Sequence, residues 1–126
     1  MPEYVSYDDE KQIIRVDSVG DSPTEVWEDS LAKVKYIRAE KPVHGVLVDT
    51  RKQETTSDYQ SILGFSMQMP NDLPFAILVS GMSANDELAQ LTLSKAQFME
   101  SAAQLRGVII RLFTDESKAV KWLLGE

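Results

Sequence analysis

The sequence predicts a single α/β domain over residues 1–126, in which a mixed sheet of about five strands is covered by helices. The first observation is a pair of strand-like segments at the N-terminus, joined by a short polar turn. The second is a regular alternation of helical and strand-like segments after that pair, which favours parallel strands with right-handed crossovers. The expected order is strand 4–7, strand 12–17, helix 22–40, strand 44–49, helix 57–69, strand 74–80, helix 83–105, strand 108–113 and helix 114–124.

The turn of the N-terminal hairpin contains three successive carboxylates, Asp8, Asp9 and Glu10. A metal ion would want oxygen ligands, but no calcium-loop spacing is present, so a solvated turn is the simpler interpretation. In the strand that follows, Ile14 and Val16 share one face and the alternate residues are charged. This pattern is typical of an outer strand with one covered and one solvated side.

Three helix starts are predicted by capping boxes, in which a serine caps the helix and an acid or amide follows three residues later. The pairs are Ser22 with Glu25, Ser57 with Gln60 and Ser94 with Gln97. The apolar side chains of the first two helices recur at helical spacing and are expected to face the core. They are Trp27, Leu31, Val34 and Ile37, then Tyr59, Ile62, Leu63 and Met67. Residues 83–93 fit either helix or loop, and both readings stay open.

The third expected strand is the segment around which we expect function to be organised. Its apolar run, residues 46–48, is typical of a strand covered on both faces, and it ends at Asp49, Thr50 and Arg51. Ligands and partners meet the carboxyl ends of strands in an open α/β sheet. Asp49 and Arg51 are two residues apart and therefore start on the same face, where they could bind a polar ligand or bond to neighbouring loops. A polar loop is expected over 50–56.

Several stretches of the chain resemble STAS domains, whose best-known members are bacterial anti-sigma-factor antagonists. They are residues 45–51, residues 75–80, and residues 107–113 followed by 119–123. The strand that ends in Asp49 and the closing run from Phe113 to Leu123 look most like the small SpoIIAA-like STAS proteins, which are sometimes grouped with lipid-binding CRAL-TRIO domains. The resemblance covers nearly the whole chain and implies one STAS-like domain.

Signalling STAS proteins carry an Asp-Ser-Ser-Gly-type motif before the second helix, where a serine or threonine is phosphorylated. This chain has Thr55, Thr56, Ser57 and Asp58 there, without the glycine and without an aspartate before the serine. Ser57 is the nearest positional match. A helix N-terminus favours an anion, so Ser57, Thr56 and Thr55 form a candidate phosphorylation or anion site. The simpler interpretation is that Ser57 only caps the helix.

The resemblance implies a non-enzymatic regulatory module that acts through protein contacts at the start of the second helix. Phe65 and Met69 fall off the apolar stripe of that helix, and if exposed they would form the apolar patch of an interface. The expected interaction face consists of Asp49, Thr50, Arg51, Asp58, Phe65 and Met69. The alternative is a carrier of a small molecule or lipid, with its pocket between helices and sheet, as the CRAL-TRIO association implies. A hydrolase that uses Asp49, His44 or Ser57 is a third hypothesis.

Composition argues against several chemistries. Acidic residues outnumber basic ones by 20 to 13, for a net charge of −7, which disfavours non-specific binding to nucleic acid. The chain has no cysteine and one histidine, so thiol chemistry and a multi-histidine metal centre within one chain are excluded, and no cofactor is expected.

No apolar run approaches the ~20 residues of a membrane span and no leader is visible, so a cytoplasmic protein is expected. A homodimer formed by pairing of exposed sheet edges stays an open alternative.

Overall fold

The structure, a computed structural model, describes residues 3–54, 57–80 and 87–126. Within these ranges five strands and four helices follow one another, and the first two strands form the predicted hairpin. The elements are β1 (Glu3–Asp8), β2 (Ile13–Asp21), α1 (Thr24–Glu40), β3 (Gly45–Glu54), α2 (Tyr59–Ser66), β4 (Phe75–Leu78), α3 (Glu87–Gln104), β5 (Ile110–Phe113) and α4 (Glu116–Leu123). The α/β fold class is confirmed.

The strands form one sheet in the order β1-β2-β3-β4-β5. β1 runs antiparallel to β2, and every later neighbour is parallel, as the alternation of elements predicts. The expectation that β2 is an outer strand is wrong, because β2 lies between β1 and β3 and the edges are β1 and β5. Its charged face is only partly covered for a different reason: the single helix on that side packs mainly against β3, β4 and β5.

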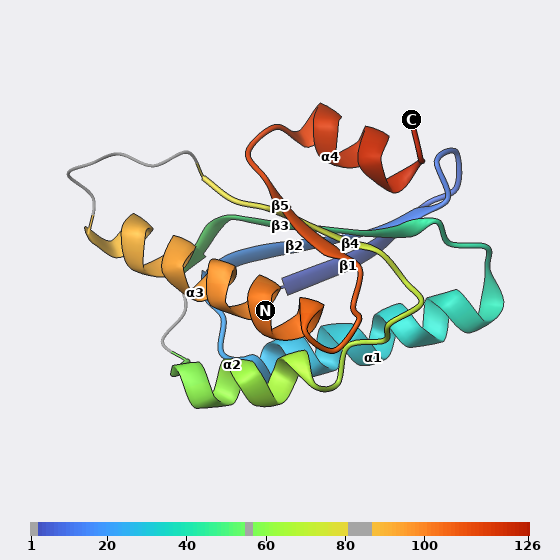
Figure 1. Ribbon diagram of the computed structural model, residues 1–126. Helices are drawn as coiled ribbons and strands as arrows, with labels where there is room; N and C mark the ends of the chain where they lie inside the picture. The colour runs from blue at the N-terminus through green and yellow to red at the C-terminus, as the bar shows by residue number, and fades with distance from the viewer. Residues whose placement is uncertain (1–2, 55–56, 81–86) are drawn as a thin grey trace.

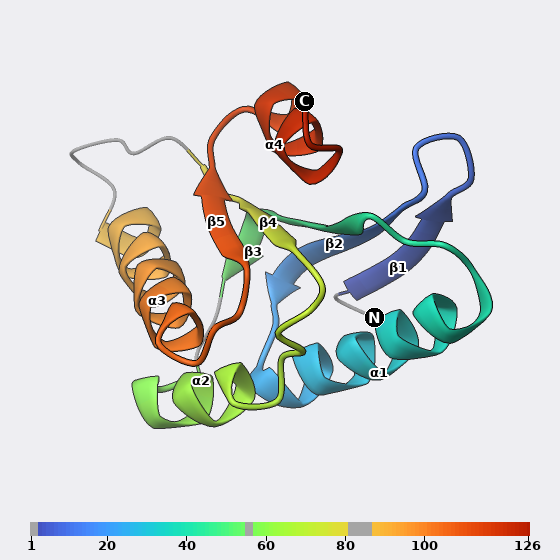
Figure 2. The same ribbon diagram turned by 45° about the vertical axis from the view of Figure 1, so that its right-hand side comes forward.

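Figures 1 and 2 show three layers, with α1, α2 and α3 on one face of the sheet and α4 alone on the other. We call the first the inner face and the second the outer face. Because side chains alternate along a strand, each central strand supplies both faces with apolar groups. Val46 points into the inner core, whereas Leu47 packs against Ala119 and Leu123 of α4. The continuous apolar run at 46–48 is therefore explained by a strand covered on both sides, as predicted.

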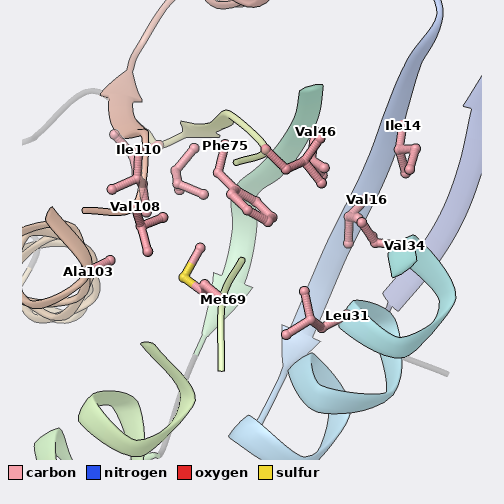
Figure 3. Close-up of a cluster of buried hydrophobic side chains, with 13 residues drawn as sticks. Ile14, Val16, Leu31, Val34, Val46, Met69, Phe75, Ala103, Val108 and Ile110 are labelled. Atoms are coloured by element: carbon pink, nitrogen blue, oxygen red, sulfur yellow. The ribbon is translucent and has the colours of Figure 1, made fainter. Parts of the chain in front are cut away.

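The inner core is built where strand and helix side chains converge. Figure 3 shows Val16, Val46 and Phe75 directed from the sheet toward the helices, with Leu31 of α1 facing them from below. Met69 approaches the same space from the segment that follows α2. Three separate helices cover this layer instead of one continuous surface. A ligand could therefore enter the layer between them.

The helix starts differ from the capping-box predictions. Pro23 is the N-cap residue of α1 and gives no side-chain cap, while the Ser22 hydroxyl donates to the Glu3 carboxylate at 2.8 Å. The cap of α2 is Asp58, whose side chain accepts from the Ser61 N–H at 2.8 Å. Ser94 lies inside α3. All three predictions are wrong. Aspartate caps as well as serine, the hydroxyls of Ser22 and Ser57 are used in tertiary hydrogen bonds, and α3 begins well before Ser94.

The apolar stripe predicted for α2 faces the wrong way. Tyr59, Leu63 and Met67 are exposed, and of the predicted stripe only Ile62 is buried. The buried face follows a second series at helical spacing, in which a fully buried serine interrupts the apolar pattern. Its members are Ile62, Phe65, Ser66 and Met69.

Two boundaries also change. β3 continues to Glu54, so most of the expected polar loop is strand and pairs with the end of β2. α3 begins at Glu87, which makes the later part of the ambiguous 83–93 segment helical. Thr55 and Thr56 of the candidate anion site, and residues 81–86, lie outside the described residues.

Candidate functional site

A pocket of about 80 Å³ lies between the inner face of the sheet and α1, α2 and α3. Since a single buried water needs roughly 10–15 Å³ by this kind of measure, the pocket has room for several water-sized groups or a small organic molecule. Most of its wall is aliphatic or aromatic, as is usual for a ligand site. The apolar wall consists of Val16, Trp27, Leu31, Val34, Val46, Val48, Phe65, Met69, Phe75, Ile77, Ala96 and Met99.

Three of the polar lining groups come from strands, and the others, Ser30, Thr92 and Lys95, come from α1 and α3. Thr50 and Gln53 lie in the second half of β3, and Glu3 is paired with Ser18, near the end of β2. The Gln53 side chain donates to the Ser18 hydroxyl at 2.9 Å, which fixes its position. The pocket therefore has a polar region toward the carboxyl ends of the parallel strands, where ligands of open α/β sheets are usually found.

Glu3 is a buried acid in the pocket wall, with 7% of the residue exposed. Ser22 donates a hydrogen bond to its Oε2 atom and Ser30 donates to its Oε1 atom. The Trp27 indole N–H in turn donates to the Ser22 hydroxyl at 2.9 Å. This chain of hydrogen bonds holds the carboxylate in one orientation, because its partners are fixed in the segment just before α1 and within α1 itself.

Two aromatic side chains form one part of the wall. The rings of Trp27 and Phe65 meet edge to face, with centroids 5.4 Å apart and planes at 76°. This arrangement favours the ring quadrupoles and restricts both side chains. It brings α1 and α2 together beside the pocket.

The outer face carries a separate group of charges, which we call the outer charge cluster: Arg15, Asp17, Asp49, Arg51 and Glu116. Arg51 donates to both carboxylate oxygens of Asp49, at 3.0 and 2.8 Å, and Arg15 reaches Asp49 at 2.9 Å. Glu116 of α4 lies within 3.3 Å of both arginines. Asp49 and Arg51 do share a face, as predicted, and the arginines and acids of the cluster satisfy one another.

The electrostatics of Asp49 lead to a testable pH dependence. Burial by itself would raise the pKa of Asp49, but hydrogen bonds from Arg51 and the charges of Arg51 and Arg15 lower it below its ordinary value. The side chain is 14% exposed. A carboxylate whose pKa is lowered in the folded state contributes stability above the unfolded pKa, and that contribution is lost as pH falls through the folded pKa.

We therefore expect Asp49→Asn to lower the free energy of unfolding by about 1–2 kcal/mol at pH 7. The difference between wild type and variant should shrink as the pH falls below about 5 and through the lowered folded-state pKa of Asp49, because the wild-type carboxyl becomes protonated. Urea unfolding at several pH values measures it. A difference that stays constant over this range would contradict the proposed pairing.

The candidate anion site is differently arranged from the prediction. Ser57 is buried, and its hydroxyl oxygen accepts the Thr24 N–H at 3.0 Å. It therefore serves the N-terminus of α1 and not the cap of its own helix, which Asp58 provides. The simple capping interpretation of Ser57 is wrong, and its phosphorylation stays a prediction.

The six residues of the expected interaction face do not form one surface. Asp49 and Arg51 belong to the outer face, whereas Thr50, Phe65 and Met69 line the pocket on the inner face. Met69 is 7% exposed, so the expectation of an apolar patch that contains it is wrong. Asp58 is taken up in capping α2. Side chains alternate between the two faces of a strand, so Asp49 and Arg51 lie on one face and Thr50 lies on the other. Phe65 and Met69 lie on the buried side of α2 and of the segment that follows it.

Other pocket residues were missed by sequence reasoning, notably Glu3, Lys95 and Met99. A signal existed for Glu3, because it is two and four residues before Val5 and Tyr7, which pack against the inner core. Strand alternation therefore places this acid on the buried face. No comparable signal marks Lys95, whose burial depends on how α3 packs on its neighbours.

The strand order, the single antiparallel edge and the distribution of helices define a SpoIIAA-like α/β fold. The crystal structure of an uncharacterized protein of the DUF3478 family with a SpoIIAA-like fold, from Shewanella loihica PV-4, is similar to this chain, with a TM-score of 0.57 and 15% identity. The match covers 96% of this chain and 91% of that chain, and at this identity it shows the fold alone. No family model matches the chain, and no curated protein matches it. Within the described ranges, every helix is too short or too polar to cross a membrane.

Proposed function

We propose that this protein is a non-enzymatic binding module that takes a small, mainly apolar molecule into the pocket beneath the sheet. The observation that carries the proposal is the pocket itself: an apolar space between three helices and the sheet, with polar groups gathered toward one end. Apolar walls supply affinity by removing ligand surface from water, and a few fixed polar groups select orientation. The size of the pocket suits a small molecule better than a long acyl chain.

The arrangement of the candidate catalytic residues supports a binding role. His44 is exposed and directly precedes β3, whereas Asp49 lies further along that strand. Five residues of extended chain separate them by roughly 17 Å, too far for one to orient the other as a base and its partner acid do. Ser57 is turned to the start of α1 by its contact with Thr24.

A pocket-filling substitution tests the proposal. Ala96 of α3 lines the pocket, so the additional side-chain atoms of Ala96→Leu would occupy ligand space. The matched control is Ala32→Leu, the same change at an exposed position of α1. We expect wild type and Ala32→Leu to bind members of a panel of small apolar fragments that includes toluene, and Ala96→Leu to bind at least about tenfold more weakly. Titrations followed by NMR measure this, and native mass spectrometry of freshly purified protein would detect a bound cellular ligand.

The proposal fails if no member of the panel binds wild type at millimolar concentration. It fails equally if Ala96→Leu binds the fragments as wild type does while retaining its fold. The melting temperature of each variant provides the check on folding.

A second candidate is a regulatory module that acts through protein contacts, as STAS resemblance implies. One observation favours it in a revised form: Tyr59 and Leu63 of α2 and its C-cap residue Met67 lie four residues apart and are all exposed. Residues at this spacing share one face of a helix. In affinity purification, Leu63→Ser should lose a partner that wild type and the exposed-residue control Tyr36→Ser retain. Homodimer formation through the β1 or β5 edge stays a prediction.

A further inference from the structure

We infer that the pocket recognises a small apolar molecule that bears a protonated amine, with the Glu3 carboxylate as the group that holds the amine. The inference rests on the proposed function and specifies its ligand chemistry. Glu3 lines the pocket, and its two oxygens are presented by a fixed network of hydroxyls.

The hydrogen-bond capacity of Glu3 is only half used by these hydroxyls. An ionised carboxylate can accept about four hydrogen bonds, two at each oxygen. Ser22 supplies one to Oε2 and Ser30 supplies one to Oε1. Each oxygen therefore keeps acceptor capacity for a donor that enters from the pocket.

Among the described residues, Glu3 also forms no ion pair within 4.0 Å. The ion pairs formed there involve the outer charge cluster, Arg38 with Asp72, and Lys41 with Asp9. A carboxylate buried with hydroxyl partners alone is costly, because desolvation is only partly offset. A cation from the ligand would complete the pair at this buried carboxylate.

The aromatic wall fits the same ligand. Trp27, whose indole N–H anchors Ser22 and hence the carboxylate, lines the pocket together with Phe65. The faces of such rings attract ammonium groups, and tryptophan does so most strongly. The carboxylate and the tryptophan thus come from one hydrogen-bonded unit, which ties the position of the charge to that of the ring.

Lys95 is the competing feature, since a buried ammonium in the pocket wall could instead attract an anionic ligand. The charge of Lys95 already has an acidic neighbour, Asp58. Hydrogen bonds from Ser61 lower the pKa of Asp58, and the positive charge of Lys95 lowers that pKa further. We therefore assign ligand selectivity to Glu3.

Four probes of one shape test this assignment: benzylamine, benzyl alcohol, toluene and benzoate. Wild type is expected to bind benzylamine at least about tenfold more tightly than toluene and benzoate, because a charge-assisted hydrogen bond forms only with the amine. Glu3→Gln removes the charge and keeps one acceptor oxygen, while its NH2 group can donate to the second serine hydroxyl. In this variant the preference for benzylamine over toluene should fall by about tenfold, while the affinity for toluene stays within about twofold of wild type. The control is Lys33→Gln, which removes a charge at an exposed position of α1 outside the pocket lining and should keep the preference.

The outcomes separate the two proposals. Equal binding of all four probes, or a preference for benzoate that Lys95→Gln abolishes, would overturn the role of Glu3 and leave the pocket as a binding site. Failure of every probe, toluene included, together with the rest of the fragment panel, would overturn both. If Glu3→Gln does not fold, the side-chain carboxyl resonance of Glu3 in wild type gives the answer, because it should shift with benzylamine and stay in place with toluene.

Discussion

Gly45→Ala is expected to lower the free energy of unfolding by about 1–3 kcal/mol, although it adds only one methyl group. Gly45 begins β3 on the outer face, where a Cβ atom would stand 2.6 Å from Leu123 Cδ2 and 3.0 Å from the Pro74 carbonyl oxygen. That carbonyl accepts the Val46 N–H at 2.8 Å and is held by the sheet. The strain must therefore be relieved mainly by moving the Leu123 side chain of α4.

Chemical denaturation of Gly45→Ala measures this effect, and the chain offers a matched control. Gly64 lies within α2, and a Cβ atom there would meet nothing within 4 Å. Gly64→Ala should raise stability by about 0.5–1 kcal/mol, because alanine is the better helix former. In a Leu123→Ala background, Gly45→Ala should cost clearly less than it does in wild type. An equal cost in both backgrounds would show that α4 does not press on the start of β3.

Phe75→Ala is expected to have the largest effect on stability, a loss of about 3–5 kcal/mol. Phe75 is 4% exposed, lies in β4 and contributes to both the inner core and the pocket wall. Truncation would enlarge the pocket without adding a polar group. The cavity should therefore accept apolar molecules, which stabilise the variant in proportion to the logarithm of their concentration.

Thermal unfolding with increasing toluene tests this second consequence. The melting temperature of Phe75→Ala should rise more steeply with toluene than that of wild type. Gly45→Ala is a suitable control because it is also destabilised but leaves the inner face unchanged, so toluene should affect it as it affects wild type. A Phe75→Ala variant that is insensitive to toluene would show that the space beneath the sheet closes when the ring is removed.

The strands of this fold could be predicted from the sequence because their signal is local. The run of apolar residues at 46–48 requires cover on both faces whatever its neighbours are, and the structure supplies it. The two faces of α2 could not be assigned in the same way. Both the series that contains Leu63 and the series that contains Phe65 have helical spacing, and only the position of the sheet decides which is buried.

The candidate site was harder to predict because it depends on tertiary packing. Neighbours such as Asp49 and Thr50 were grouped by sequence, but the strand sends one to the outer charge cluster and the other to the pocket. Ser57 was assigned to the helix it precedes, whereas its hydroxyl serves α1 through a contact 33 residues away. The pocket itself is the volume that three helices leave unfilled, and no local pattern encodes such a volume.

Methyl resonances of wild-type protein, followed by NMR during titration with toluene, test the central claim most directly. A ligand in the pocket should shift the methyl groups that line it, among them Val16, Val48 and Met99, in a saturable way. The methyl groups of Ala119 and Leu123, on the opposite side of the sheet, should move little. Saturable shifts at these α4 residues with none beneath the sheet would contradict the account.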